Sequence, residues 1–150
     1  MRGILVVVFA LFVAVIFTGC GGGSAYLQDG KLKQTIEQTN QTDKYMEAIG
    51  LGAAIKDSTD STQRKASSRN AAIVAAEYDF VKRIKGVKIE GGVTIEKAME
   101  TDSKIKATVD DCIKGAEVVK TEWDNNDGCV VTMRIDKELL QKNLGVKFEK

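Results

Sequence analysis

The chain of 150 residues contains 22 basic and 21 acidic residues, which gives a net charge of +1 at pH 7. A chain so close to neutrality has no electrostatic footprint for nucleic acid and no polybasic patch for a membrane surface. It also contains no histidine, which excludes the metal sites and catalytic triads that require imidazole.

The first predicted element is an apolar segment that ends at a cysteine. Arg2 precedes an apolar run over residues 4–17, and Gly19 leads directly to Cys20. A basic start, a short apolar run and small residues at a cleavage site are typical of a secretory signal peptide. Because cleavage would fall directly before Cys20, the segment resembles a bacterial lipobox. The resemblance implies a diacylglycerol on the thiol of Cys20 and an acyl chain on the new amino terminus.

Two alternatives to this interpretation are a membrane-spanning anchor and a signal peptide followed by an unrelated cysteine. The apolar run covers about 14 residues, which is shorter than the roughly 20 that a spanning helix needs. Stable anchoring requires more than one acyl chain, and a lipidated Cys20 would supply them. Gly21, in place of an acidic residue, favours the outer membrane under the sorting rule of enteric bacteria. The expected location is therefore the bacterial outer membrane.

The sequence predicts three regions: a signal peptide over residues 1–19, a lipidated cysteine with a flexible tether over 20–44, and a folded domain over 45–150. The tether begins with Gly21-Gly22-Gly23-Ser24 and continues with polar residues. A spacer that holds the domain away from the lipid is the expected role. Weak apolar spacing at Leu27, Leu32 and Ile36 leaves a short helix as the alternative.

The folded domain begins with a predicted strand and a long helix. Successive side chains of residues 45–51 would alternate between two faces, which is typical of a strand. Gly50 and Gly52 would let this strand bend or let another backbone approach it closely. Residues 61–85 form the clearest helix. Asp60 or Ser61 can cap its start, and Gly86 lies where a left-handed residue often ends a helix.

The apolar arc of this helix is wider than one sheet requires. Ile73, Ala76, Phe80 and Ile84 share one side, and the apolar arc extends through Ala66, Val74, Tyr78 and Val81. A second helix or a neighbouring subunit would have to cover the rest. Asn70 and Glu77 fall inside the arc and are a candidate buried polar pair. Such groups either form a functional site or are satisfied by buried hydrogen bonds.

The remaining elements follow in order after the long helix. First come a short strand over 86–89, a turn at Gly91-Gly92, and a strand or the lead into a helix over 93–95. Helices near 96–100 and 103–113 follow. A hairpin over 116–135 and a last helix over 136–143 end the chain. The Asn/Asp-rich residues 124–128 mark the hairpin turn. The sequence therefore predicts an α+β fold. One long helix and a shorter second helix pack on a small, mainly antiparallel sheet that closes with a C-terminal hairpin.

Two cysteines remain besides Cys20. Cys112 and Cys129 both lie on the apolar side of their elements, so they are a candidate disulfide in an oxidising compartment. The alternative is two buried thiols whose Cα atoms never approach within the roughly 7 Å that a disulfide needs.

The order of several short motifs resembles the Lpp-twenty family of outer-membrane lipoproteins. After the lipobox come Gly50-Leu51-Gly52, Arg69-Asn70-Ala71-Ala72 on the long helix, and Gly86-Val87-Lys88-Ile89; residues 113–120 and 127–133 are similar to the family's closing hairpin. The resemblance covers roughly residues 45–140 and implies a compact α/β domain without catalysis. Some members assemble into rings around the flagellar motor, and others are surface lipoproteins.

Three classes of function can be compared. A structural or assembly lipoprotein is favoured, with the outer membrane, a second copy or other envelope proteins as partners. A lipoprotein that binds an envelope or host ligand is the alternative. An enzyme is disfavoured, because no nucleophile elbow, phosphate-binding loop or dinucleotide fingerprint is present. The only expected prosthetic group is the lipid on Cys20, and no metal site or cofactor is expected.

Overall fold

The computed structural model describes residues 26–32 and 42–149. The predicted signal peptide and Cys20 lie outside the described residues. The helices are α1 (Ser61–Lys85), α2 (Ile95–Thr101), α3 (Ser103–Lys114) and α4 (Lys137–Leu144). The strands are β1 (Leu27–Gln28), β2 (Lys31–Leu32), β3 (Tyr45–Gly52), β4 (Lys88–Ile89), β5 (Val93–Thr94), β6 (Glu117–Trp123) and β7 (Cys129–Asp136).

The largest sheet has three antiparallel strands in the order β3-β7-β6. The central strand β7 pairs with β3 from Tyr45↔Asp136 to Gly52↔Cys129. It also pairs with β6, where the register shifts between Val118 and Lys120. Such a bulge adds one residue that has no partner on the neighbouring strand, and in β6 this residue is Val119. The domain is thus α+β with an antiparallel sheet, as the sequence predicts.

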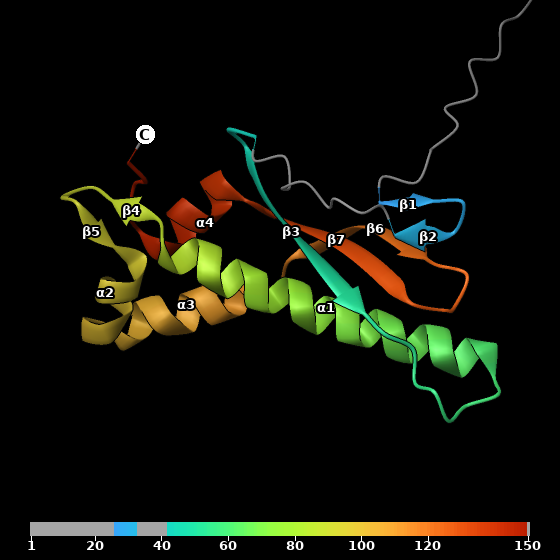
Figure 1. The fold of residues 1–150 in the computed structure, drawn as a ribbon. Helices are drawn as coiled ribbons and strands as arrows, with labels where there is room; N and C mark the ends of the chain where they lie inside the picture. The colour runs from blue at the N-terminus through green and yellow to red at the C-terminus, as the bar shows by residue number, and fades with distance from the viewer. Residues whose placement is uncertain (1–25, 33–41, 150) are drawn as a thin grey trace, which may run out of the picture.

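Helix α1 packs on one face of this sheet, mainly against β3 and β7, and its C-terminal part runs on past the sheet (Figure 1). Its start is capped by Asp60, whose side chain accepts a hydrogen bond from the backbone N–H of Thr62 at 2.8 Å. Its last turn carries three basic residues, which interact favourably with the negative end of the helix dipole. Its bounds are those predicted from the sequence.

The helix lies unusually close to β3, because glycines on the strand face small residues on the helix. A Cβ atom on Gly50 would overlap the carbonyl oxygen of Ala72 and lie 2.6 Å from the N atom of Ala76. A Cβ atom on Gly52 would overlap the carbonyl oxygen of Ser68. The close approach of another backbone, expected at these glycines, is therefore confirmed, and the backbone is that of α1.

The other helices cover the C-terminal half of α1. Helices α2 and α3 contact α1 and each other, and α4 contacts both α3 and β7 (Figure 1). The hydrophobic core is continuous between the sheet and these helices, and its largest fully buried side chains include Phe80, Ile84, Ile95, Val109 and Leu140. No helix within the described residues is both long and apolar enough to cross a bilayer.

Three details differ from the sequence prediction. The described residues contain four helices, whereas only two were expected to pack on the sheet; the last of them, α4, follows the hairpin as the sequence predicts. Gly86 has φ −75°, so it is not left-handed; Val87 donates to the carbonyl oxygen of Ile84 at 3.1 Å, which satisfies the helix end without a left-handed residue. Gly145, which ends α4, has φ +66° and takes that conformation instead.

The third difference concerns the predicted tether. Strands β1 and β2 form a small hairpin within it, and Leu27 is buried. The backbone N–H of Asn125 donates to the carbonyl oxygen of Gly30 at 2.9 Å, and Nδ2 of Asn125 donates to that of Asp29 at 3.0 Å. Residues 26–32 are therefore ordered against the β6–β7 turn and do not belong to a purely flexible linker.

Candidate functional site

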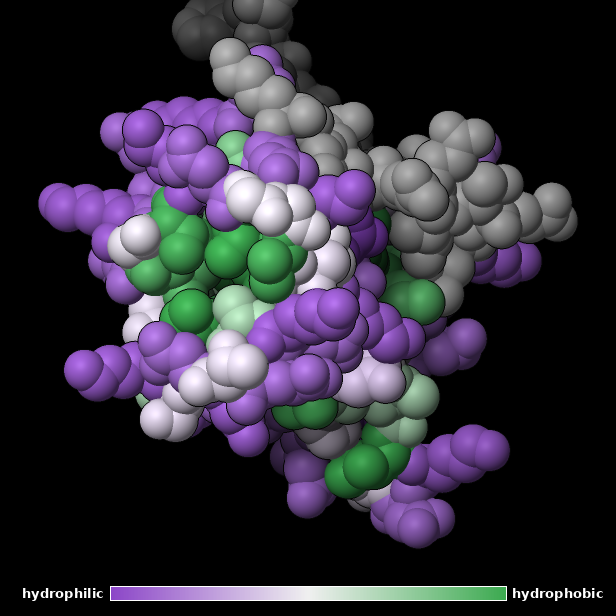
Figure 2. Space-filling view, turned by 90° about the vertical axis from the view of Figure 1, so that its left-hand side faces the viewer, coloured by the Kyte–Doolittle hydropathy of each residue, from purple (hydrophilic) through white to green (hydrophobic). Residues whose placement is uncertain are grey.

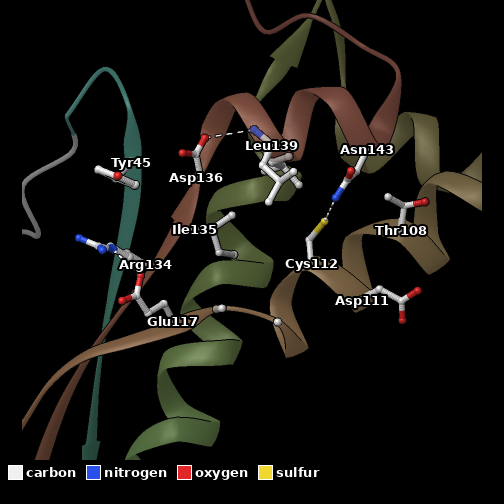
Figure 3. A pocket seen from close by; sticks show the side chains of 13 residues that line it. Tyr45, Thr108, Asp111, Cys112, Glu117, Arg134, Ile135, Asp136, Leu139 and Asn143 are labelled. Carbon is white, nitrogen blue, oxygen red and sulfur yellow. Dashed lines mark hydrogen bonds and ion pairs between the residues drawn. The ribbon is translucent and has the colours of Figure 1, made fainter.

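A cleft of about 680 Å³ opens at the end of the sheet where β7 meets α4. Its walls come from the first residue of β3, the last turn of α3, the link from α3 to β6, the end of β7 and helix α4 (Figure 3). Gly115 and Ala116 form the link between α3 and β6, and their small size leaves space there. The cleft is thus assembled from three stretches of the chain that are distant in sequence, namely Tyr45, residues 108–117 and residues 134–143.

One side of the cleft is built around Arg134. Its Nε donates to Oε2 of Glu117 on the neighbouring strand at 2.8 Å, and its guanidinium carbon lies 4.7 Å from the centre of the Tyr45 ring. The hydrogen bond to Glu117 is the main reason that the pKa of Arg134 is raised above its ordinary value. The positive charge of Arg134 is therefore already matched by a carboxylate and an aromatic face.

The remaining lining combines apolar and acidic groups. Ile135, Leu139 and Leu140 supply the apolar surface, and Leu139 is 55% exposed. Asp136 lies at the start of α4, where its Oδ1 accepts hydrogen bonds from the backbone N–H groups of Glu138 and Leu139. Asp111 lies across the cleft, in the last turn of α3 (Figure 3). An apolar floor with carboxylates around it can bind a partly apolar ligand and orient its polar part.

Cys112 lines this cleft, and Cys129 does not. Nδ2 of Asn143 lies 3.7 Å from the sulfur of Cys112, and the two side chains point toward each other (Figure 3). Cys129 is the first residue of β7, whereas Ile135 and Asp136, which line the cleft with Cys112, are at its other end. A strand rises about 3.3 Å per residue, so the two cysteines are far beyond the roughly 7 Å limit for a disulfide. Both are free thiols, so of the two alternatives the structure has two separate thiols and no disulfide.

The opposite end of the sheet is closed by a polar cluster around Asp127. This residue lies in the β6–β7 turn with φ +64° and is buried. Its Oδ2 accepts from Nε of Arg64 at 2.8 Å, and its carboxylate also accepts from the hydroxyl of Ser61. The hydrogen bond from Arg64 is the largest of the effects that lower the pKa of Asp127. Nε1 of Trp123 donates to the carbonyl oxygen of Lys65 at 3.3 Å.

The predicted polar pair on α1 is not buried. Asn70 is exposed and Glu77 is half-buried. The buried stripe of α1 instead recurs every fourth residue, at Ser68, Ala72, Ala76, Phe80 and Ile84. Ser68 is tolerated there because its hydroxyl donates to the carbonyl oxygen of Lys65 at 3.0 Å. The prediction placed the pair wrongly because the sheet contacts a narrower stripe of α1 than the apolar arc, and near the β3 glycines this stripe consists of small residues.

The outer part of the predicted apolar arc stays at the surface. Val74 is 64% exposed and Tyr78 is 62% exposed. Helices α2 and α3 cover other parts of α1, with Ile73 and Val81 packed against the core. Nζ of Lys82 lies 4.7 Å from the centre of the Tyr78 ring. A second helix therefore covers only part of the arc.

A separate apolar patch lies at the end of the molecule that carries β4, β5 and α2. Figure 2 shows it framed by hydrophilic side chains. The apolar side chains of these elements that are not fully buried are Ile89, Val93 and Met99. This patch and the exposed part of α1 are two distinct apolar surfaces of the domain.

Within the described residues, no group of three or more Cys, Asp or Glu side chains is arranged to hold a metal ion. Comparisons of this chain with protein-family models, with curated proteins and with solved structures give no match. The similarity to the Lpp-twenty family therefore stays a prediction that depends on the motifs alone.

The sequence indicated Cys112 and Glu117 as parts of elements, but it did not indicate the cleft. Tyr45, Arg134 and Leu139 come from three separate elements and share no motif spacing. Two local signals could have pointed to the site. Asp111 places a negative charge in the last turn of a helix, where a cation is favoured, and Leu139 is an apolar residue on the polar side of a short helix.

Proposed function

We propose that this protein is a lipid-anchored outer-membrane lipoprotein with a structural or assembly role and no catalytic activity. The observation that carries the proposal is the exposed pair Val74 and Tyr78 on α1. Large apolar side chains adjacent on one helix face mark interaction sites more often than scattered ones do. The motor-associated rings formed by some Lpp-twenty lipoproteins are a role that the resemblance brings to this chain.

The lipid anchor supports this role because it concentrates the domain in two dimensions. Proteins held on one membrane reach high effective concentrations, so weak contacts between them become significant. An apolar helix face that is too small to hold a dimer in dilute solution can therefore act when many copies share a surface. Self-association should depend on the helix face and on the anchor together.

The test is self-association of the complete chain in detergent, measured by analytical ultracentrifugation over a wide concentration range. We expect Val74→Ser/Tyr78→Ser to weaken association by about tenfold or more, because each serine replaces an apolar contact with a hydrated side chain. The matched control is Leu51→Ser/Ile55→Ser, which also removes two exposed apolar side chains but lies outside both apolar surfaces.

A photoreactive residue at position 78 extends the test to living cells. Crosslinks between copies would support a homo-oligomer, and crosslinks to another envelope protein would support an assembly with that partner. A chain that stays monomeric at every concentration and gives no crosslink at position 78 would contradict the assembly role.

The cleft supports a second candidate, a lipoprotein that binds an envelope or host ligand. Its volume of about 680 Å³ is within the usual range for small-molecule and peptide sites, about 300–1,000 Å³. Soaking fragments into crystals of the domain tests this candidate, and fragments that avoid the cleft would count against it.

A further inference from the structure

The cleft beside α4 has a charge imbalance that restricts what it can bind. Three carboxylates line it, those of Asp111, Glu117 and Asp136, and Arg134 is the only basic residue among the lining residues. Glu117 is hydrogen-bonded to Arg134, and Asp136 interacts with Lys44, which lies outside the lining. Asp111 has no cationic partner of its own in the lining. A ligand that brings a positive charge would supply one.

The position of Asp111 shows that this charge is not explained by helix stability. It lies in the last turn of α3, next to the negative end of the helix dipole, where a carboxylate is unfavourable. Asp136 is different, because it caps α4 through Oδ1. An asparagine would serve as well as a cap, so the cap alone does not require a negative charge at this position.

The apolar surface between the two carboxylates defines the rest of the ligand. Figure 3 shows Ile135 and Leu139 between Asp136 and Glu117 on one side and Cys112 and Asp111 on the other. Leu139 remains 55% exposed although it sits beside a core residue, Leu140. An occupant that covers Leu139 would remove apolar surface from water.

We propose that the cleft binds a peptide segment in which lysine or arginine alternates with apolar residues. The apolar side chains lie on Ile135 and Leu139, and the basic side chains lie beside Asp111 and Asp136. An extended segment fits because its side chains alternate and the carboxylates flank the apolar floor. This inference rests on the binding role proposed above and gives it a partner chemistry.

The test uses the complete chain in nanodiscs of zwitterionic phosphatidylcholine, whose lipids do not attract basic peptides. The probe is a hexapeptide of alternating leucine and lysine that carries an uncharged coumarin label, and a leucine–glutamate hexapeptide is its counterpart. Fluorescence anisotropy should show binding of the basic peptide alone, and the affinity should fall as salt screens the carboxylates.

Two pairs of variants locate the binding. Asp111→Asn/Asp136→Asn should lower the affinity for the basic peptide by about fivefold or more. Asp110→Asn/Glu138→Gln changes the net charge equally, but its affinity should stay within about twofold of the wild-type value. Ala116→Leu fills the cleft and should also weaken binding, while Ala107→Leu on the exposed side of α3 should not. Unchanged unfolding midpoints would show that each variant folds.

Cys112 provides a direct readout of occupancy. A saturating concentration of the basic hexapeptide should slow the alkylation of Cys112 by iodoacetamide. The rate is measured by mass spectrometry of the proteolytic fragment that contains Cys112. Equal loss of affinity in both carboxylate pairs would overturn the proposal, since it would indicate general charge attraction. Binding of the acidic peptide that depends on Ala116 would overturn the assigned chemistry and leave a binding role standing. Binding of neither peptide would contradict the proposal, and fragment soaking would then decide the binding role alone.

Discussion

The two ends of strand β7 are built in opposite ways. At Cys129 the sheet lies directly under α1, the turn is fastened by Asp127, and a glycine of β3 brings the helix backbone close. At Asp136 the same strand leads into α4 and borders an open cleft. One strand therefore links a closed end, where small residues and buried polar contacts favour stability, to an open end with an excess of acidic lining residues and exposed apolar surface.

If the cleft has the proposed binding role, rigidity and recognition lie in separate parts of one small core. Close packing transmits strain and tolerates little change, so a binding site benefits from lying away from the tightest contact. The cleft satisfies this condition, because its walls come from the ends of elements. Variation of Leu139 or Asp111 can change recognition without disturbing the contact between β3 and α1.

The largest effect is expected at the closed end, from Gly50→Ala. The added Cβ would overlap the Ala72 carbonyl oxygen, and α1 cannot move away without losing its core contacts. We expect the free energy of unfolding to fall by at least about 3 kcal/mol, measured by urea denaturation. Gly86→Ala is the matched control.

Gly86 has ordinary helical dihedral angles, and the nearest atom to its added Cβ would be 3.6 Å away. This alanine should therefore be neutral or stabilise the protein by up to about 1 kcal/mol. A loss of stability at Gly86 similar to that at Gly50 would contradict the close-approach explanation.

The second effect is a difference in thiol reactivity between the two ends. Cys112 lines the cleft, whereas Cys129 is 2% exposed, and burial raises the pKa of the Cys129 thiol. Because the thiolate is the reactive form, iodoacetamide at pH 8 should modify Cys112 on the order of 100-fold faster or more than Cys129, which must await local opening. Mass spectrometry of the two cysteine peptides gives the rates.

The same experiment in urea without reductant checks the state of both cysteines. Both thiols should then react fully, because neither is in a disulfide. Protection of both in urea until reductant is added would contradict the structure and restore the disulfide hypothesis.

These two ends also show what the sequence could predict. The bounds of α1 followed from apolar periodicity and the Asp60 cap, and the β6–β7 hairpin followed from the Asn/Asp-rich turn, because both signals are local. The glycines of β3 indicated a close approach. The sequence could not identify the partner of Cys112, because register and helix placement decide which side chains meet.

The cleft was unpredictable for the same reason. It depends on three distant stretches of the chain meeting at one place, and none of them carries a motif. The error at Asn70 has another cause. The predicted arc depends on the hydropathy of the residues on one side of the helix, whereas packing on a strand that contains glycines favours small side chains. Ser68 is buried because only small side chains fit against the glycines of β3, whereas Val74 lies on the other side of α1 and is exposed.

The smallest effect is expected from Asp127→Asn, because its ion-pair partner Arg64 has a side chain that is 29% exposed, and ion pairs that solvent reaches contribute little. Asparagine keeps the size of the side chain and tolerates the left-handed conformation at this position, so only the charge is lost. Arg64 and Ser61 lower the pKa of Asp127 in the folded protein. The stabilisation is therefore present above the ordinary aspartate pKa of about 3.9 and is lost as the pH falls through the lower, folded value.

Urea midpoints at pH 7 and at pH 3 test this dependence. The wild-type chain should be more stable than Asp127→Asn at pH 7, and the difference should shrink at pH 3 as the wild-type carboxylate gains a proton. Asp57→Asn, an exposed carboxylate in the loop before α1, should show no such convergence. A gap for Asp127→Asn that is equal at both pH values would mean that the size and hydrogen-bonding geometry of the side chain, and not its charge, fasten the turn. The closed end would then be held by packing alone, and charge would be a property of the open end only.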